Sequence, residues 1–191
     1  AGPAGAGKTA LLRRVERLAA GAKAFCDPLP PVPPGLPEGP EVVMVQYAGT
    51  TIEAVDVGET EARAWPKFLP ESHAIAFVLD GRVAAGPVAA DADAALERAL
   101  VELLGLLKGG LVPRSMPLLV LITKADDEPS CAYTAAEVEA ALRRTLGSSA
   151  PYCSHVALVS ALPDGTMDTS RAEALHASLS GAMDWLCNAT V

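Results

Sequence analysis

An α/β fold is predicted by this sequence, with a mostly parallel β-sheet that carries helices on both faces. Short apolar segments alternate along the chain with longer segments in which apolar residues recur at helical spacing. Several of the apolar segments contain almost no polar residue, which is typical of strands that are covered on both sides. With 191 residues, of which 50% are hydrophobic and 20% charged, the chain is long enough for one domain, residues 1–191, with a substantial core.

Five segments are expected to form strands. They are residues 41–47, 51–57, 74–79, 118–122 and 155–159. The first two are joined by a short turn, and helical segments separate the others, which predicts right-handed parallel connections. A doubly wound sheet of this type would place another strand before Ala1. We therefore expect that the first strand is missing from the N-terminus and that the chain is a fragment of a longer protein.

Helices are expected between and after these strands. The first covers residues 8–20 and follows a glycine-rich turn. Residues 92–107 carry a single stripe of leucines, which are Leu96, Leu100, Leu103, Leu104 and Leu107. A third helix is expected to begin after Thr134, because Thr134 and Glu137 have the spacing of a capping box. The last helix carries an apolar stripe made of Leu175, Leu179, Met183 and Leu186.

Two apolar segments outside these elements each have two interpretations. Residues 28–40 contain seven prolines, so they form neither a helix nor a central strand. They are either a stiff, extended surface loop or a docking peptide for a proline-binding groove. Trp65, Pro66 and Phe68 either pack a helix onto the sheet or form a patch for a partner protein.

Charge and cysteine content argue against several classes of function. The formal net charge is −8, whereas a protein that binds nucleic acid needs a basic face. The four cysteines form no C-x-x-C pair and have no histidine at zinc-ligand spacing, so ordinary thiols in a reducing, cytoplasmic compartment are expected. Ordinary surface or core roles are likewise expected for His73, His155 and His176. No apolar run approaches the roughly 20 residues of a membrane span, so membrane association is expected only through an N-terminal segment outside this sequence.

The first chemical motif is a phosphate-binding loop. Residues 2–9, G-P-A-G-A-G-K-T, fit the pattern G-x-x-x-x-G-K-S/T. Small residues let backbone N–H groups approach phosphate oxygens, and the helix that follows directs its positive end at the same anion. Lys8 is expected to reach the β- and γ-phosphates, and the Thr9 hydroxyl to bind Mg²⁺. The predicted nucleotide-binding residues of this loop are Gly2, Ala4, Gly5, Ala6, Gly7, Lys8, Thr9 and Ala10.

Acidic and polar residues also follow the predicted strands, at the edge where α/β sheets bind ligands. Asp56 ends the second strand and is expected to hold Mg²⁺ together with Thr9. Thr123, Lys124 and Asp126 follow the fourth strand. The Asp126 carboxylate can accept hydrogen bonds from N1 and the exocyclic amine of guanine, which adenine cannot offer, and the Lys124 stem can lie across the base. We expect these residues to read the base.

A fourth group follows the last strand, namely Ser160, Ala161 and Leu162. A backbone N–H there could meet the O6 atom of guanine. The three residues carry little information alone, but they stand in register with the other motifs. We include them among the predicted nucleotide-binding residues.

With these motifs in order, the chain resembles the small Ras-like GTPases over nearly its whole length. Within them it is most similar to the Arf and Arf-like branch, with the signal-recognition-particle receptor β subunit as a near neighbour. Residues 56–58 (D-V-G) match the start of that branch's D-V-G-G-Q, and residues 184–186 (D-W-L) resemble the end of its last helix. Thr123 replaces the Asn of the family's N-K-x-D motif and Leu162 replaces the Lys of S-A-K, as in Rho-type members. The resemblance implies a P-loop NTPase fold of the Ras-like class, GTP or GDP with Mg²⁺ as ligands, and protein partners.

The departures from the family pattern concern the switch regions. Glu59 replaces the glycine whose N–H senses the γ-phosphate, and its carboxylate would repel phosphate charge. Thr60 stands where the family has the glutamine that orients the attacking water, so no catalytic residue is assigned. No Thr or Ser lies between Phe25 and Ala48, where the first switch should supply one to Mg²⁺, and the proline-rich residues 28–40 take its place.

These observations predict a guanine-nucleotide-binding protein of the Arf-like type with weak or absent GTP hydrolysis. It is expected to act through protein effectors or as an assembly subunit, with no role for nucleic acid. The alternative is a pseudo-GTPase that serves as a structural subunit of a larger assembly. A P-loop kinase or ATPase is disfavoured, because residues 123–126 would have no role there. Association with an organelle or cilium stays open.

Overall fold

The computed structural model describes residues 1–3, 5–21, 40–57, 65–82, 89–108, 112–126, 133–147, 153–160 and 168–190. The helices are α1 (Lys8–Ala19), α2 (Trp65–Phe68), α3 (Ala89–Lys108), α4 (Ala135–Leu146) and α5 (Thr169–Ala189), and a short 3₁₀ helix, η2 (Leu69–Glu71), follows α2. The strands are β1 (Glu41–Tyr47), β2 (Thr50–Asp56), β3 (Ile75–Asp80), β4 (Leu118–Thr123) and β5 (Ser154–Leu158). All five predicted strands are present, with bounds that agree within one residue.

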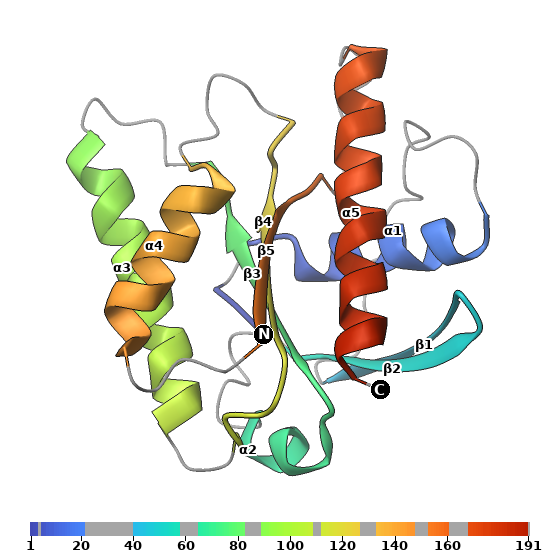
Figure 1. The fold of residues 1–191 in the computed structure, drawn as a ribbon, viewed down its shortest axis with the longest axis horizontal. Helices are drawn as coiled ribbons and strands as arrows, with labels where there is room; N and C mark the ends of the chain where they lie inside the picture. The colour runs from blue at the N-terminus through green and yellow to red at the C-terminus, as the bar shows by residue number, and fades with distance from the viewer. Residues whose placement is uncertain are drawn as a thin grey trace.

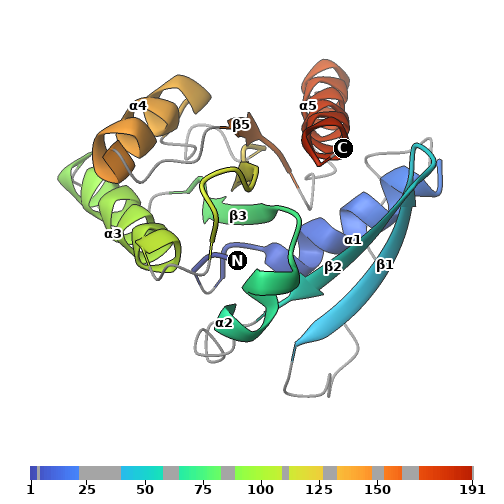
Figure 2. The ribbon, with the colours of Figure 1, turned by 60° about the horizontal axis from the view of Figure 1, so that its bottom comes forward.

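The strands form two sheets in the described part of the chain, where a single sheet was expected. Strands β3, β4 and β5 form a parallel sheet in this order, and β1 and β2 form a separate antiparallel hairpin. The edge of β3 that faces away from β4 is occupied by Ala1 instead of a strand (Figure 2). The Ala1 amino group donates to the carbonyl oxygen of Ala76 at 2.9 Å, and the N–H of Val78 donates to Ala1 O at 2.9 Å. Among the residues that the structure describes, neither strand of the hairpin pairs with the parallel sheet.

Helices cover both faces of the parallel sheet, as predicted (Figure 1). Strand β4 shows why, because all six of its residues are buried and the five apolar ones alternate between two cores. Val120 and Ile122 pack in a core with α3 and α4. Leu119 and Leu121 pack in a second core with α1, α5 and the inner face of β1. The near-continuous apolar sequence of β4 is thus explained by burial on both sides.

The β1–β2 hairpin has one buried and one exposed face. Val43, Val45 and Tyr47 pack toward α1 and α5, whereas Val42 and Met44 are 54% and 56% exposed. The turn consists of Ala48 and Gly49 alone, since Tyr47 pairs with Thr50. Both turn residues have positive φ, 47° and 83°, which is the conformation of the tight turns that match strand twist.

Local sequence signals account for the helix bounds. The predicted capping box of α4 is present: Thr134 Oγ1 accepts from the Glu137 N–H at 3.3 Å, and the Glu137 carboxylate accepts from the Thr134 N–H at 2.8 Å. Phe68 packs against the α3/α4 core, which favours the packing role over a partner patch, while Pro66 is exposed. Residues 28–39 of the proline-rich segment lie outside the described residues. None of the described helices combines the length and apolar character that crossing a bilayer requires.

Candidate nucleotide-binding site

The glycine-rich loop runs from the edge of β3 to the start of α1. Gly2 is buried with φ +134°, and a Cβ atom on it would lie 2.2 Å from the carbonyl oxygen of Val78. Only glycine fits there, because such a contact would require the β3 backbone to move. The first glycine of the motif thus fixes the loop against the sheet.

The start of α1 is arranged to meet an anion. Its N-cap residue, Gly7, has left-handed φ of 82° and gives the helix no side-chain cap. No acidic residue lies in the first turn, so no carboxylate of the helix itself neutralises its positive end. The first backbone N–H groups of a helix lack partners within the helix, so they are available to phosphate oxygens.

Lys8 bends back over this loop. Its Nζ atom donates to the carbonyl oxygens of Gly2 at 2.9 Å and Pro3 at 2.8 Å. Ala10, the last predicted residue of the loop motif, packs partly buried in the α1/α5 core. The loop therefore holds a lysine whose charge lies beside the N-terminal end of α1.

The two predicted Mg²⁺ ligands are in direct contact. Thr9 Oγ1, in the first turn of α1, donates to Oδ2 of Asp56, the last residue of β2, at 2.5 Å. A hydroxyl and a carboxylate oxygen are hard donors that suit Mg²⁺, which takes only one or two such protein ligands beside phosphates and water. The donor set at this place thus fits the ion.

The predicted base-reading residues are fastened to the loop. Thr123, which ends β4, is fully buried, and its Oγ1 lies 2.6 Å from the carbonyl oxygen of Ala6 and 2.9 Å from that of Leu79. Lys124 Nζ donates to the carbonyl oxygen of Gly5 at 2.8 Å. The segment that would read a base and the loop that would hold phosphates are therefore one hydrogen-bonded unit.

Two residues that the sequence analysis did not single out complete this unit. Asp80, which ends β3, forms an ion pair with Lys124. Arg171, in the first turn of α5, donates to the carbonyl oxygen of Ala125. A signal for Asp80 existed, since it follows an apolar strand as Thr123 does. No local pattern distinguishes Arg171, because its partner lies 46 residues away in the chain.

The last predicted group lies beside the base-reading segment. The Ala125 N–H donates to the carbonyl oxygen of Val159 at 3.3 Å, which brings half-buried Asp126 close to Ser160 in the backbone. The Ser160 hydroxyl is fully buried and has no hydrogen-bond partner among the residues that the structure describes. Such a group is costly unless a partner satisfies it, so it fits a site that takes a polar ligand. Ala4, Thr60, Ala161 and Leu162 lie outside the described residues, as does Glu59.

The structure thus brings together Gly2, Gly5, Ala6, Gly7, Lys8, Thr9, Asp56, Thr123 and Lys124 by direct contacts or through the loop backbone. Asp126 and Ser160 lie at the adjoining ends of β4 and β5. All of these groups gather near the carboxyl ends of the strands or at the start of α1. That is the edge at which open α/β sheets bind ligands.

No family model matches the chain, and no curated protein sequence matches it. Among solved structures, the Arl6/BBS3 small GTPase from Trypanosoma brucei, determined with the bound nucleotide analogue GppNp, is similar, with a TM-score of 0.67. The match covers 97% of this chain and 91% of that chain, at 18% sequence identity. The chain therefore has an α/β fold like that of this small GTPase, which confirms the fold class predicted from its sequence.

Proposed function

We propose that the chain binds guanine nucleotides together with Mg²⁺. The observation that carries this proposal is the joining of two motifs distant in sequence. Thr123 bonds to Ala6 and Lys124 to Gly5, so the predicted base-reading segment is fastened to the predicted phosphate loop across 117 and 119 residues. A Gly-rich loop alone could form by chance, whereas a chance turn has no reason to be fastened to a segment that follows another strand.

Each group has a distinct role in this proposal. The N–H groups of the loop and of the first turn of α1 bind the phosphates, and Lys8 balances their charge. Thr9 and Asp56 hold Mg²⁺, which neutralises phosphate charge when bound. Asp126 accepts hydrogen bonds from the guanine edge, which selects guanine over adenine. The fold similarity to a small GTPase solved with a nucleotide analogue supports this assignment.

We propose further that GTP hydrolysis is weak or absent. Glu59 and Thr60 occupy the positions of the residues that sense the γ-phosphate and orient water in the family that the chain resembles. A protein that binds a nucleotide without hydrolysing it has no product to supply, so its function depends on the proteins that it contacts. We therefore infer protein effectors or assembly subunits as partners of a single G domain spanning residues 1–191.

A second candidate is a pseudo-GTPase that keeps the fold without exchanging nucleotide. The contacts of the Lys8 and Lys124 ammonium groups with the loop's own carbonyl oxygens favour it, since these contacts stabilise the loop without a ligand. In this case the hydrogen-bonded loop and base-reading segment would serve only to stabilise a surface that contacts other subunits.

Nucleotide extraction distinguishes the two candidates. The full chain is purified without added nucleotide, denatured, and the supernatant is separated by ion-exchange chromatography; the proposal expects GDP or GTP. A titration with the fluorescent analogue mant-GDP in the presence of excess Mg²⁺ follows on protein that has been stripped of ligand. An empty site with a flat titration would favour the pseudo-GTPase.

A further inference from the structure

We propose that Asp80 is a positioning residue of the base-reading segment, which it holds against the phosphate loop through the ammonium group of Lys124. This inference rests on the proposed function, because the segment has this role only if a nucleotide binds. It assigns a role to a residue that none of the sequence motifs contains. The partners are Asp80 at the end of β3, Lys124 after β4 and Gly5 in the loop.

The backbone conformation of Lys124 gives the first reason that this segment needs a stabilising contact. Its φ is +59°, in the left-handed region, which costs a residue with a Cβ roughly 1 kcal/mol. A non-glycine residue keeps this conformation when its surroundings hold it there, and such residues concentrate at functional sites. The next residues along the chain include Asp126, so the conformation at position 124 sets where that carboxylate lies.

The side chain of Lys124 supplies the restraint. Its Nζ atom is shared between the carbonyl oxygen of Gly5, at 2.8 Å, and the Oδ2 atom of Asp80. The Lys124 side chain is 25% exposed and that of Asp80 is 33% exposed, so the ion pair is partly shielded from water. Asp80 neutralises the ammonium group at the place where it meets the loop, and the direction of the lysine side chain is fixed at its charged end.

Asp80 is itself held in place by its other carboxylate oxygen. Oδ1 accepts a hydrogen bond from the backbone N–H of Arg82 at 3.0 Å and lies 3.7 Å from the Arg82 Nε atom. The two oxygens therefore have separate tasks, one toward the chain that follows β3 and one toward Lys124. The backbone adds a parallel link, since the Gly81 N–H donates to the carbonyl oxygen of Thr123 at 2.9 Å.

The test compares the release rates of mant-GDP from the full chain and its variants. Asp80→Asn keeps the shape of the side chain and its bond from Arg82 but removes the charge, and it should release mant-GDP about fivefold faster. Asp80→Glu should restore part of the loss. Arg82→Gln is the matched control, because it removes the 3.7 Å ion pair with Asp80 while the backbone bond to Asp80 stays, and its release rate should change less than twofold.

A double-mutant cycle separates positioning from a general structural effect. If Asp80 acts through Lys124, Asp80→Asn adds nothing to the release rate on a Lys124→Gln background. The full fivefold factor on that background, or an unchanged rate for Asp80→Asn alone, would overturn the inference and leave the proposed function intact. Circular dichroism verifies that each variant is folded.

If the wild type binds no mant-GDP, the proposed function is wrong and release rates cannot be measured. The role of Asp80 is then tested by a measurement that needs no nucleotide. Amide hydrogen exchange of the unliganded protein, measured by NMR, should then be about fivefold faster in Asp80→Asn at Gly81 and Ala125, whose N–H groups bond to Thr123 and Val159. The Ala172 amide in α5 should not change. Equal exchange at Gly81 and Ala125 in both proteins would show that Asp80 holds nothing in place.

Discussion

The hydroxyl of Thr9 lies 2.5 Å from a carboxylate oxygen of Asp56, although 47 residues separate the two in the chain. The pair joins the first turn of α1 to the end of β2, and so links the hairpin to the phosphate loop. Both groups offer oxygen atoms of the kind that Mg²⁺ takes as ligands. The contact therefore leads directly to a prediction about metal ions.

Removing the charge of Asp56 should abolish the Mg²⁺ dependence of nucleotide binding. Chelation by EDTA is expected to accelerate mant-GDP release from the wild type by about tenfold or more, the factor that corresponds to 1.4 kcal/mol. It should not alter release from Asp56→Asn. Glu53→Gln, an exposed carboxylate on the same strand, should behave as the wild type. Equal EDTA sensitivity of wild type and Asp56→Asn would exclude the metal role.

Replacing Asp126 by Asn should change the base preference. The amide group can donate a hydrogen bond to the second carbonyl of xanthine, where the carboxylate accepts one from the amine of guanine. The ratio of GDP to XDP affinity, measured by competition against mant-labelled nucleotide, is expected to fall by about tenfold or more. Glu139→Gln, which alters an exposed ion pair on α4, should leave the ratio unchanged. A constant ratio in Asp126→Asn would remove this residue from the base-reading role.

Gly2→Ala should strongly destabilise the protein. The added Cβ would lie 2.2 Å from a backbone oxygen of β3, and the φ of +134° is unfavourable for alanine. We expect a loss of about 3 kcal/mol or more in the free energy of unfolding by urea, or no folded protein. Gly105→Ala is the matched control, because nothing lies within 4 Å of the new Cβ in helix α3. That variant should gain up to about 1 kcal/mol through helix propensity.

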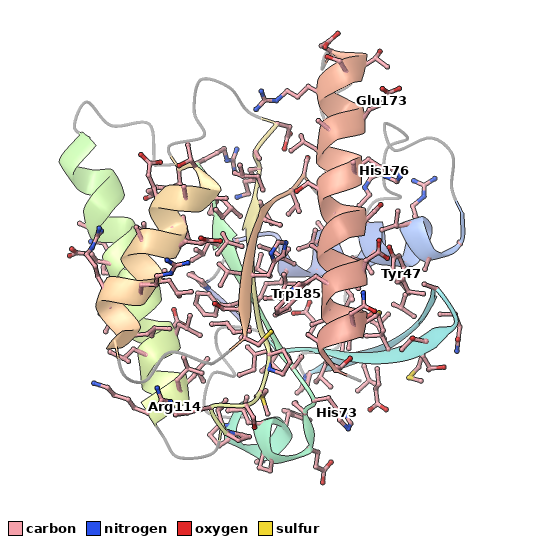
Figure 3. All side chains as sticks on the ribbon, viewed as in Figure 1. Tyr47, His73, Arg114, Glu173, His176 and Trp185 are labelled. Atoms are coloured by element: carbon pink, nitrogen blue, oxygen red, sulfur yellow. The ribbon has the colours of Figure 1, made fainter. Side chains whose placement is uncertain are left out.

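Tyr47 should make the stability depend on alkaline pH. Its hydroxyl lies 3.0 Å from Oδ1 of Asp184 and 3.2 Å from the carbonyl oxygen of Ser180, both on α5 (Figure 3). Burial and the Asp184 carboxylate raise the pKa of Tyr47 to about 12, above the usual 10. The hydroxyl therefore stabilises the fold fully below pH 10, and this contribution is lost as the pH rises toward 12.

The Tyr47→Phe variant tests this assignment. At pH 8 it should be less stable than the wild type by about 1 kcal/mol, because a hydrogen bond is lost. The difference in urea unfolding free energy should shrink at pH 11, and the absorbance change at 295 nm near pH 12 should be smaller by one tyrosine. A difference that grows with pH would contradict the assigned direction.

Introducing at positions 59 and 60 the residues of the small GTPases that the chain resembles should raise GTP hydrolysis. Glu59→Gly with Thr60→Gln returns the γ-phosphate sensor and the water-orienting side chain, and phosphate release from GTP should rise toward the order of 10⁻⁴ to 10⁻³ per second of intact members. Glu59→Gln serves as the control, since it removes the charge but restores neither group. Turnover of the wild type at such rates would show that residues 59 and 60 do not limit the reaction.

Most elements of the fold could be predicted because their signals are local. Three signals each predict a structure from a short stretch of sequence. They are the leucine stripe of α3, the Thr134–Glu137 capping box and the apolar sequence of β4. Strand pairing is different, because it depends on which edges are available in three dimensions. The separate hairpin was not predicted: within the described residues β1 and β2 pair with each other, and Ala1 bonds to the free edge of β3.

The candidate site was predictable to the extent that its chemistry follows short motifs. The loop, Asp56 and Thr123–Asp126 were predicted in this way, whereas Asp80 and Arg171 were not. Asp80 has one local signal, the apolar strand before it, and Arg171 has none. Their partners are 44 and 46 residues distant, so no short motif contains both members of either pair. Only the placement of β3, β4 and α5 around one edge brings these pairs into contact.

The position of Thr123 has a practical consequence. It is the final residue of the strand at the centre of the parallel sheet, and it also contacts the loop through the Ala6 carbonyl oxygen. A ligand that binds to the phosphate loop should therefore also stabilise strand β4 at the centre of the sheet. The melting temperature of the protein should rise with the fraction of sites that the ligand occupies. Melting temperatures measured with a panel of unlabelled small molecules would then show which of them the protein binds most tightly.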